Sequence, residues 1–430
     1  MSLLGLVVWS THTSQATYPP ELDEHLQEIT RDIHPFGSAA NFRVRDYLLS
    51  QIPEEYAVTT QEFSYYDRDL TNILAFLDNG GESTRMISVH YDSAENSYGA
   101  GDIGTGVAAA LTLLPEWAEM DLSDNLLILF VDGEEGLHLE GRSPETPLEY
   151  GPGSDDDFLL GSHYFVENYG GEYGEINKVF NFEGRGTGGR LLLFDTVGYS
   201  GAEVVAWNRN LSTLTFSLSE ALFETQPNVT DVVEYRRLPN ARILNFAYVG
   251  EGENYHEPTD NFENVDSVSK ADTYETMRKL IGGEGETMAE STPAVYASMG
   301  PWTLSTPRWV VQIGAWLSLA YLLGSHWQRA NYWLLGPLLA LLSVLALEFT
   351  YLLVWSGILF AVVYRYRTLC GSFYARAIVL AGSLGLWYPF VVVMGWLEGF
   401  GSLGFVILLS ALAIIQYTYY RALEIVDPSP

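Results

Sequence analysis

Cysteine and lysine are nearly absent from this chain of 430 residues. Its one cysteine, Cys370, lies in an apolar region, so no disulfide can stabilise the polar part that precedes it. Lysine occurs at Lys178, Lys270 and Lys279, and arginine supplies the rest of the 22 basic residues. Against these stand 54 acidic residues, which give a formal net charge of −32 at pH 7. Nucleic acid is not an expected partner of so acidic a surface.

The negative charge is concentrated in the part of the chain before position 308. From Arg308 onward, six arginines face four acids, a net charge of +2, so residues 1–307 carry −34. Dense acid with arginine in place of lysine indicates a halophilic surface, adapted to concentrated salt that screens self-repulsion. The alternative is an ordinary acidic secreted domain.

We expect residues 1–307 to need molar salt to stay folded. The Debye length falls from about 10 Å at ~0.1 M ionic strength to about 3 Å at ~1 M, so repulsion between surface carboxylates weakens steeply. Thermal melting in potassium chloride at about 0.1 M and about 3 M tests this screening argument. The expected result is a higher melting temperature in the concentrated salt, and equal temperatures would contradict it.

Residues 308–421 are almost continuously apolar and predict an all-α bundle of about five transmembrane helices. The run at 332–365 is too long for one span, since about 20 residues cross the hydrocarbon core, and Glu348 lies near its middle. Splitting it there puts the loop arginines on one side, which the positive-inside rule makes cytoplasmic. These are Arg329, Arg365, Arg367, Arg376 and Arg421. The tail 422–430 is then cytoplasmic and the polar domain extracytoplasmic. Four spans with one long tilted helix are the alternative.

The polar part divides into a short start, one domain and a connection. Residues 1–24 begin with a short apolar stretch that fits the stub of a membrane anchor. Residues 25–285 alternate strand-like and helix-like runs, which predicts an α/β domain with a mixed, mostly parallel central sheet flanked by helices. Residues 286–307 lack periodicity and read as a linker.

Histidines and acids follow the hydrophobic runs of this domain. Runs at 86–90, 126–132 and 179–183 end in acids or a histidine, and a fourth at 243–249 leads into a loop with another histidine. In an open α/β sheet, ligands gather at the carboxyl ends of the strands. The side chains gathered there would be His90, Asp92, Asp102, Glu134, Glu135, Glu183 and His256. Imidazole nitrogens together with carboxylate oxygens suit zinc.

Spacing within this set indicates different tasks. His90 and Asp92 are two residues apart, so in a continuing strand both side chains point to one face, and the carboxylate can bond the ring nitrogen that is not on the metal. Glu134 and Glu135 are adjacent and diverge, so one can bind metal while the other acts as a general base. Asp102 precedes a helix in a glycine-rich stretch, where it fits either a carboxylate bridging two metals or a simple helix cap.

Five stretches resemble the co-catalytic zinc aminopeptidases of the aminopeptidase S and aminopeptidase Y type. They lie, in the family's order, at 34–49, 88–114, 127–137, 181–189 and 246–266. The likeness is stronger to the membrane-anchored branch, which includes the vacuolar membrane protease and the endoplasmic reticulum metallopeptidase. The resemblance implies the zinc exopeptidase fold and a hydrolase that removes N-terminal residues from peptides with two zinc ions.

Carried over by position, the resemblance implies five metal ligands. His90 and Glu183 would hold one zinc, Glu135 and His256 would hold the other, and Asp102 would bridge the two.

The same resemblance assigns three further residues. Glu134 would be the general base, Asp92 would orient the first zinc histidine, and Tyr255 would be a candidate to stabilise the oxyanion. The chain departs from the family in two places. Ile103 stands where a second acid often follows the bridging aspartate, and an acidic insertion at 138–157 follows the glutamate pair. The insertion leaves the substrate range open.

Other functions compete with a peptidase that binds peptides and, through 308–421, the lipid bilayer. A catalytically inactive peptidase-fold domain could serve a membrane protein as a binding or accessory module, but the ligand set here is complete. A transporter would carry more charge within the membrane than Glu348 and Glu398. A glutaminyl cyclase resembles this fold with a single zinc, so metal counting separates it. The oligomeric state does not follow from the sequence.

Overall fold

The computed structural model describes residues 17–136, 158–211, 213–216, 230–282, 294–299 and 302–307. All of them lie in the first of two compact units, Met1–Ile313. Most of the expected anchor stub, the insertion 138–157, the membrane region 308–421 and the tail lie outside the described residues. None of the helices within the described ranges has the length and hydropathy needed to cross a bilayer.

The described strands form one mixed sheet in the order β1-β2-β4-β3-β5-β8-β6-β7-β9-β10. The strands are β1 (Ala57–Tyr65), β2 (Arg68–Leu77), β3 (Ser83–His90), β4 (Asn125–Val131), β5 (Glu175–Gly184), β6 (Leu192–Val197), β7 (Leu214–Phe216), β8 (Arg242–Tyr248), β9 (Ala294–Met299) and β10 (Trp302–Pro307).

The four neighbouring strands β4, β3, β5 and β8 run parallel, which confirms the predicted parallel centre. Strand β2 joins this centre antiparallel on the β4 side, and β6 joins it antiparallel on the β8 side. In this register His90 pairs with Val131, and Glu183 pairs with Ala247. The carboxyl ends of the central strands therefore meet at one edge of the sheet.

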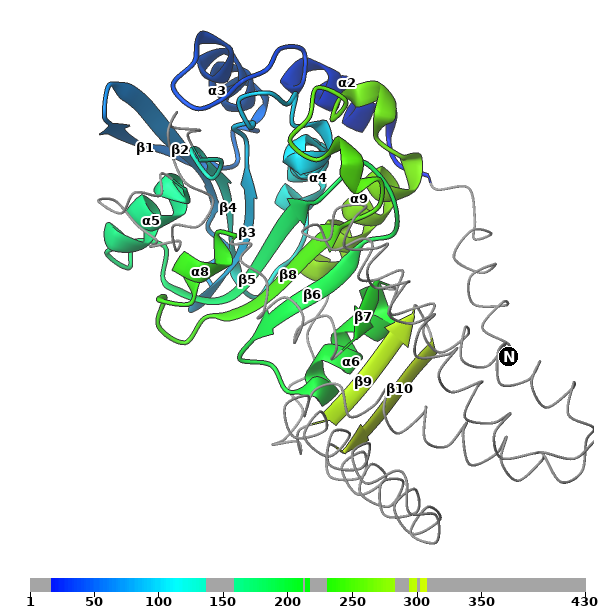
Figure 1. The fold of residues 1–430 in the computed structure, drawn as a ribbon. Helices are drawn as coiled ribbons and strands as arrows, with labels where there is room; N and C mark the ends of the chain where they lie inside the picture. Colours follow the sequence, from blue (N-terminus) through cyan, green and yellow to red (C-terminus); the bar gives the residue numbers. More distant parts are fainter. Residues whose placement is uncertain are drawn as a thin grey trace, which may run out of the picture. The chain divides into compact units, whose positions relative to one another are not determined.

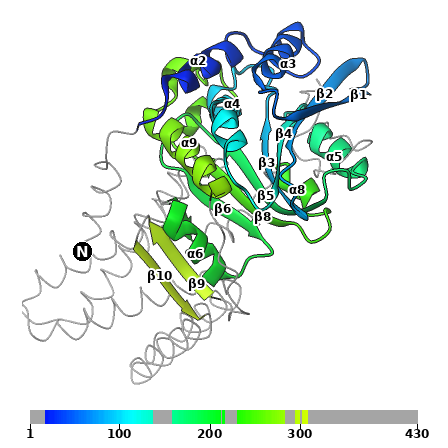
Figure 2. The ribbon, with the colours of Figure 1, turned by 180° about the vertical axis from the view of Figure 1, so that it is seen from behind.

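Helices flank this sheet, as the sequence predicted (Figure 1). They are α2 (Pro20–Ile29), α3 (Ala39–Gln51), α4 (Thr105–Ala118), α5 (Leu160–Glu167), α6 (Gly201–Leu211), α8 (Val232–Tyr235) and α9 (Ser267–Gly282). Helices α2, α4 and α9 contact one another on one side of the central strands, and α5 and α8 contact each other on the other side (Figure 2).

Strand β4 shows why its sequence is apolar without a break from Leu126 to Val131. Every residue of Asn125–Val131 is buried. The even-numbered residues from 126 to 130 pack in the core beneath α2, α4 and α9, while the odd-numbered residues from 127 to 131 pack in the core beneath α5 and α8. A strand covered by helices on both faces has no position left for a polar side chain.

A strand hairpin lies where the sequence suggested a linker. Strands β9 and β10 pair antiparallel, and β9 also pairs with β7. The segment 294–307 contains Val, Tyr, Trp and Thr on either side of a Gly-Pro pair. These residues favour strands, and Gly-Pro favours a turn, so local preference outweighed the missing periodicity on which the linker prediction rested.

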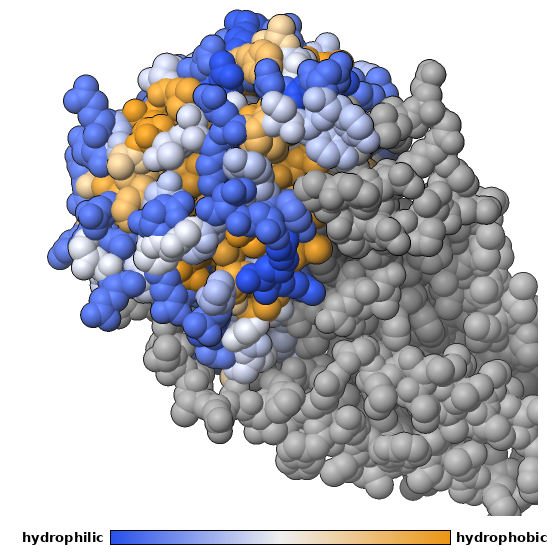
Figure 3. All heavy atoms as spheres, turned by 90° about the vertical axis from the view of Figure 1, so that its left-hand side faces the viewer, coloured by the Kyte–Doolittle hydropathy of each residue, from blue (hydrophilic) through white to orange (hydrophobic). Residues whose placement is uncertain are grey.

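The described surface is largely hydrophilic on the face shown in Figure 3, with apolar patches between polar side chains. Among the described residues, the large apolar side chains recorded as exposed are Val58, at 43%, and Tyr66, at 76%. Both lie on the β1–β2 hairpin, so most large apolar side chains of the described part serve the core.

A buried carboxylate at the end of β4 ties this strand to its surroundings. Asp132 accepts hydrogen bonds from Thr71 N at 2.8 Å, Asn41 Nδ2 at 3.0 Å and the Tyr91 hydroxyl at 3.0 Å.

We expect Asp132→Ala to lower the free energy of unfolding by about 3 kcal/mol or more, because each buried donor left unpaired costs roughly 1–3 kcal/mol. Chemical denaturation in high salt measures this. Asp67→Ala, at an exposed turn, is the control and should stay within about 0.5 kcal/mol of the parent; equal stability of the two variants would disprove the expectation.

Candidate metal centre

The carboxyl edge of the sheet gathers all the predicted ligands. His90 is the last residue of β3, Glu183 is the last but one of β5, and Glu134 and Glu135 form the turn after β4. Asp102 lies in a turn, η1 (Ala100–Gly104), that leads into α4. His256 and Tyr255 follow a short helix, η2 (Gly252–Asn254), after β8.

One group of ligands surrounds the His90 imidazole. Its Nε2 lies 3.7 Å from Asp102 Oδ1, 3.7 Å from Glu183 Oε2 and 4.0 Å from Glu134 Oε2. These atoms are spaced around a common centre rather than hydrogen-bonded to one another. His90, Asp102 and Glu183 could hold a metal ion together.

A second group surrounds the His256 imidazole. Its Nε2 lies 3.2 Å from Asp102 Oδ2 and 3.0 Å from Glu135 Oε1. Asp102, Glu135 and His256 therefore form another possible metal-binding set. A further combination, His90 with Glu134 and Glu135, is also within reach of one ion. Asp102 is common to the first two sets and turns a different oxygen to each.

Burial and charge at this edge fit a site for cations. Asp102, Glu134, Glu135 and Glu183 are all at most 7% exposed. Within the described residues, His90 Nε2 is buried without a hydrogen-bond partner, and Glu135 Oε1 has only the His256 imidazole beside it. So many carboxylates without matching cations would be costly to bury, and unpaired imidazole and carboxylate atoms are the donors that zinc takes.

The titration behaviour shows the same excess of negative charge. Burial raises the pKa of Glu183 to about 8 and that of Glu134 well above its usual value. Burial works against protonation of His256, but Glu135 and Asp102 outweigh it and raise its pKa to about 11. The raised pKa values of these buried carboxyls show that their charged forms would be stabilised by a nearby cation.

Asp92 contacts His90 differently from the expectation. The His90 Nδ1 atom lies 3.1 Å from the main-chain oxygen of Asp92, whereas the carboxylate Oδ1 is 3.7 Å away. The two carboxylate oxygens accept hydrogen bonds from Glu134 N at 3.1 Å and Glu135 N at 3.0 Å. The side chain of Asp92 thus fixes the turn that carries both glutamates, and its backbone fixes the imidazole.

Glycines let the Asp102 turn approach β5. A Cβ atom added to Gly184 would lie 2.0 Å from the Gly101 carbonyl oxygen, and one added to Gly101 would lie 2.2 Å from the Gly186 oxygen. No larger residue fits either position without moving the backbone. The glycine-rich stretch before α4 is therefore needed to bring Asp102 beside Glu183.

Tyr255 lies within a stack of three side chains. Its ring is 3.8 Å from the His256 ring with an interplanar angle of 22°. Its hydroxyl accepts a hydrogen bond from Arg185 Nη1. Arg185 was not among the predicted site residues, although it lies only two residues beyond Glu183, in the bend after β5.

Two further acids at the site were missed by the sequence reasoning. Asp260 is fully buried and accepts hydrogen bonds from Gly101 N at 2.5 Å and Asp102 N at 3.3 Å. It lies four residues after His256 in the stretch 246–266, and this position in the sequence could have identified it as a site residue. Asp231, at the start of α8, is 1% exposed, and neither carboxylate oxygen has a hydrogen-bond partner within the described ranges. No pattern in the sequence singled it out.

Hydrogen bonds secure the chain on both sides of 137–157. Leu159 N donates to Glu134 O at 3.1 Å, and Leu160 N donates to Gly133 O at 2.8 Å. A Cβ atom added to Gly136 would lie 2.3 Å from the Phe158 ring, so these residues are in close contact. The residues on either side of 137–157 therefore lie next to each other, beside Glu134 and Glu135.

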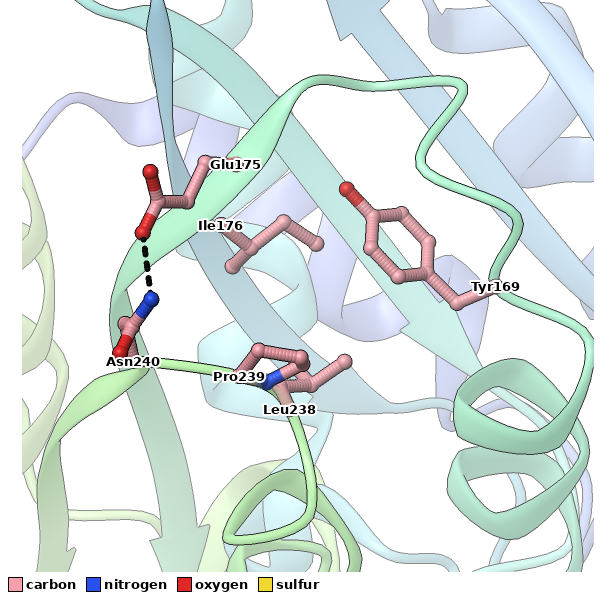
Figure 4. Close-up of a pocket in the computed structure, with 6 residues that line it drawn as sticks. All are labelled: Tyr169, Glu175, Ile176, Leu238, Pro239 and Asn240. Atoms are coloured by element: carbon pink, nitrogen blue, oxygen red, sulfur yellow. Dashed lines mark hydrogen bonds between the residues drawn. The ribbon is translucent and has the colours of Figure 1, made fainter.

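A pocket at the opposite end of the sheet lacks comparable chemistry. It lies beside the starts of β5 and β8, with one hydrogen bond from Asn240 Nδ2 to Glu175 Oε1 at 3.0 Å (Figure 4). Its lining residues are Tyr169, Glu175, Ile176, Leu238, Pro239 and Asn240. With a single carboxylate, it offers no set of metal ligands, so we place the functional site at the carboxyl edge.

Comparison with known proteins gives one family match. The family model described as Peptidase family M28 matches residues 72–281. This range contains all eight predicted site residues, six of them from His90 to Glu183 and two in the loop after β8. The vacuolar membrane protease of Meyerozyma guilliermondii is 27% identical over 294 residues, covering 60% of this chain and 27% of that protein. The chain thus spans about a quarter of the length of this curated relative.

Solved structures that resemble this chain are more distant from it in sequence. The glutaminyl cyclase of Porphyromonas gingivalis is 17% identical, with a TM-score of 0.49, and covers 63% of this chain and 99% of its own. A leucine aminopeptidase precursor of Bacteroides thetaiotaomicron is 16% identical, with a TM-score of 0.48, and covers 64% and 98% respectively.

Proposed function

We propose that this chain, whose residues 72–281 match the model of peptidase family M28, is a two-zinc aminopeptidase that is anchored in a membrane and acts outside the cytoplasm. Its substrates would be peptides with a free N-terminal amine. The relative from Meyerozyma guilliermondii is described as a vacuolar membrane protease, which supports the membrane assignment. The apolar sequence 308–421 would supply the anchor, with its C-terminus in the cytoplasm.

One observation carries the proposal: the carboxylate of Asp102 faces two separate histidines. Its Oδ1 is 3.7 Å from His90 Nε2, and its Oδ2 is 3.2 Å from His256 Nε2. A helix cap would accept a backbone hydrogen bond in the first turn of α4, but the described residues show no such bond from this side chain to that helix. We therefore assign Asp102 as the bridge, with Glu183 completing one zinc site and Glu135 the other.

The residues around the ligands suit peptide hydrolysis. Bound zinc ions would polarise the scissile carbonyl and make water a stronger nucleophile near neutral pH. Glu134 is not needed in either ligand set that shares Asp102, so its carboxylate is available to take a proton from the attacking water and give it to the leaving amine. Tyr255 would donate its hydroxyl hydrogen to the carbonyl oxygen as negative charge develops there. Asp92 would hold the glutamate turn in place.

Hydrolysis of aminoacyl anilides in concentrated salt tests the activity. The zinc-loaded full chain should release the aniline from substrates with a free amine and leave the N-acetylated counterparts intact. Equal cleavage of both would contradict an aminopeptidase. No cleavage of any substrate in the panel would favour an inactive binding domain instead.

We expect two metal ions per chain. Elemental analysis after reconstitution with zinc and removal of the excess should give a ratio of about two, because five ligands form two sets around one carboxylate. A ratio of one would favour a single-zinc enzyme such as a glutaminyl cyclase. A chelator-treated sample is the control, and both activity and metal should return together when zinc is added.

A further inference from the structure

Arg185 introduces a positive charge at the edge of the acidic site. Its main-chain nitrogen donates to Tyr248 O at 2.9 Å, which fixes the chain just beyond the end of β5. It follows the last residue of β5, Gly184, and lies in the bend that begins there. Burial works against the charged form of this guanidinium, but Tyr255 and the nearby carboxylates Asp102, Glu183 and Glu134 outweigh it and raise the pKa of Arg185.

The guanidinium contacts Tyr255 in two ways. Its Nη1 donates to the Tyr255 hydroxyl oxygen, and its Cζ lies 5.2 Å from the centre of the Tyr255 ring. The same ring also stacks against the His256 imidazole, with 3.8 Å between the ring centres. The stack therefore runs from Arg185 through Tyr255 to a proposed zinc ligand.

This stack ends in the loop after β8, where the backbone of His256 has an uncommon conformation. His256 has a positive φ of 59°, which is uncommon for a residue with a side chain, and the side chain is 37% exposed. Neither the backbone preference nor a surrounding core determines how the imidazole lies. Asp102 and Glu135 contact its Nε2 atom, and the stacked tyrosine ring supports the face of the imidazole.

Hydrogen-bond chemistry shows what Arg185 does to the phenol. A tyrosine hydroxyl offers one hydrogen and two acceptor positions, whereas arginine has donors only. The hydrogen bond must therefore use an oxygen lone pair, and the phenolic hydrogen stays available for another acceptor. A charged donor on that oxygen also makes its O–H bond more polar and a better hydrogen-bond donor.

We propose that Arg185 is a positioning residue that turns the Tyr255 hydroxyl hydrogen toward the substrate's carbonyl oxygen and, through the ring stack, orients His256. The inference deepens the proposed peptidase function and rests on it. The competing role is direct binding of an anionic group of the substrate through the other N–H groups of the guanidinium.

A double-mutant cycle on a neutral substrate, leucine p-nitroanilide, separates these roles. Tyr255→Phe removes one oxyanion donor and should lower kcat by about 10²–10³-fold. Arg185→Met should lower kcat by about 10-fold or more and leave KM within about twofold, since it acts through a group used in the transition state. In the Tyr255→Phe background, Arg185→Met should change kcat by less than about twofold, because the hydroxyl on which it acts is gone. Arg185→Lys, which keeps a charged donor, should recover part of the loss.

Binding provides a readout independent of turnover. The boronic acid analogue of leucine forms a tetrahedral adduct, and calorimetry should show about 10-fold weaker binding to Arg185→Met but no further loss when Tyr255→Phe is already present. Zinc content and thermal melting of each variant show whether it is folded and loaded. If Arg185→Met does not fold, Arg185→Lys and Arg185→Gln in the same cycle give the coupling.

The outcomes distinguish the two proposals. An active wild-type chain in which the effects of Arg185→Met and Tyr255→Phe multiply independently would overturn this inference alone. So would an increase in KM confined to substrates with an added carboxylate, which would make Arg185 an anion site. A zinc-loaded wild-type chain that neither cleaves the anilide nor binds the boronic acid would overturn the proposed function, and this inference with it.

Discussion

Replacing Glu134 by glutamine should lower kcat by about 10²–10⁴-fold while both zinc ions stay bound, because the amide keeps the shape of the carboxylate but cannot accept the proton. The geometry separates this residue from its neighbour. Glu135 Oε1 is 3.0 Å from His256 Nε2, whereas the nearest histidine nitrogen to Glu134 is 4.0 Å away. Glu135→Gln should therefore weaken metal binding first and lose activity as a result.

Steady-state kinetics and elemental analysis of the two variants, side by side, make the comparison. Glu62→Gln, on the exposed edge strand β1, is the matched control and should behave as the parent. Excess zinc should restore activity to Glu135→Gln but not to Glu134→Gln. Loss of zinc from Glu134→Gln with retention in Glu135→Gln would show that the two roles are reversed.

Asp102→Asn should have a comparably large effect through a different route. Both carboxylate oxygens face histidines, and an amide offers one oxygen and one NH₂ group that repels a cation. We expect the zinc content to fall below two per chain and kcat to drop by about 10³-fold, since metal catalysis supplies several kcal/mol of transition-state stabilisation.

Metal titration by calorimetry, in parent and variant, gives the number of sites and their affinities. Asp67→Asn, in an exposed turn, controls for the loss of one negative charge. If Asp102→Asn binds two zinc ions with the affinity of the parent, the carboxylate is not a bridge. Its place before α4 would then be explained by local structure alone.

The sequence could place the candidate ligands at one edge of the sheet because they follow buried strands. Runs such as β4, apolar on both faces, can be recognised without a structure, and parallel strands deliver their ends to one edge. His90, Glu135 and Glu183 could be placed in this way. The pairing of specific oxygens with specific histidines could not, because it depends on side-chain directions within loops.

Contacts across the loops were the part that the sequence did not reveal. Spacing suggested that the Asp92 carboxylate orients His90, yet this side chain accepts from the glutamate amides, and the main chain takes the imidazole. Asp260 and Arg185 belong to loops that are far from their partners in sequence. Hydrogen bonds of this kind leave no periodic pattern, so nothing short of the folded chain shows them.

The attachment of residues 137–157 has an evolutionary consequence. Leu159 N and Leu160 N donate hydrogen bonds to the main-chain oxygens of Glu134 and Gly133. The two ends of the intervening segment are therefore held together, whatever its length. Closing a longer loop costs only about 0.6 kcal/mol for each doubling of its length. Insertions and deletions at this position can therefore accumulate in a lineage with little penalty to the proton-transfer residue next to them. A shortened variant joined between Gly136 and Phe158 would be a practical scaffold on which new substrate contacts could be selected.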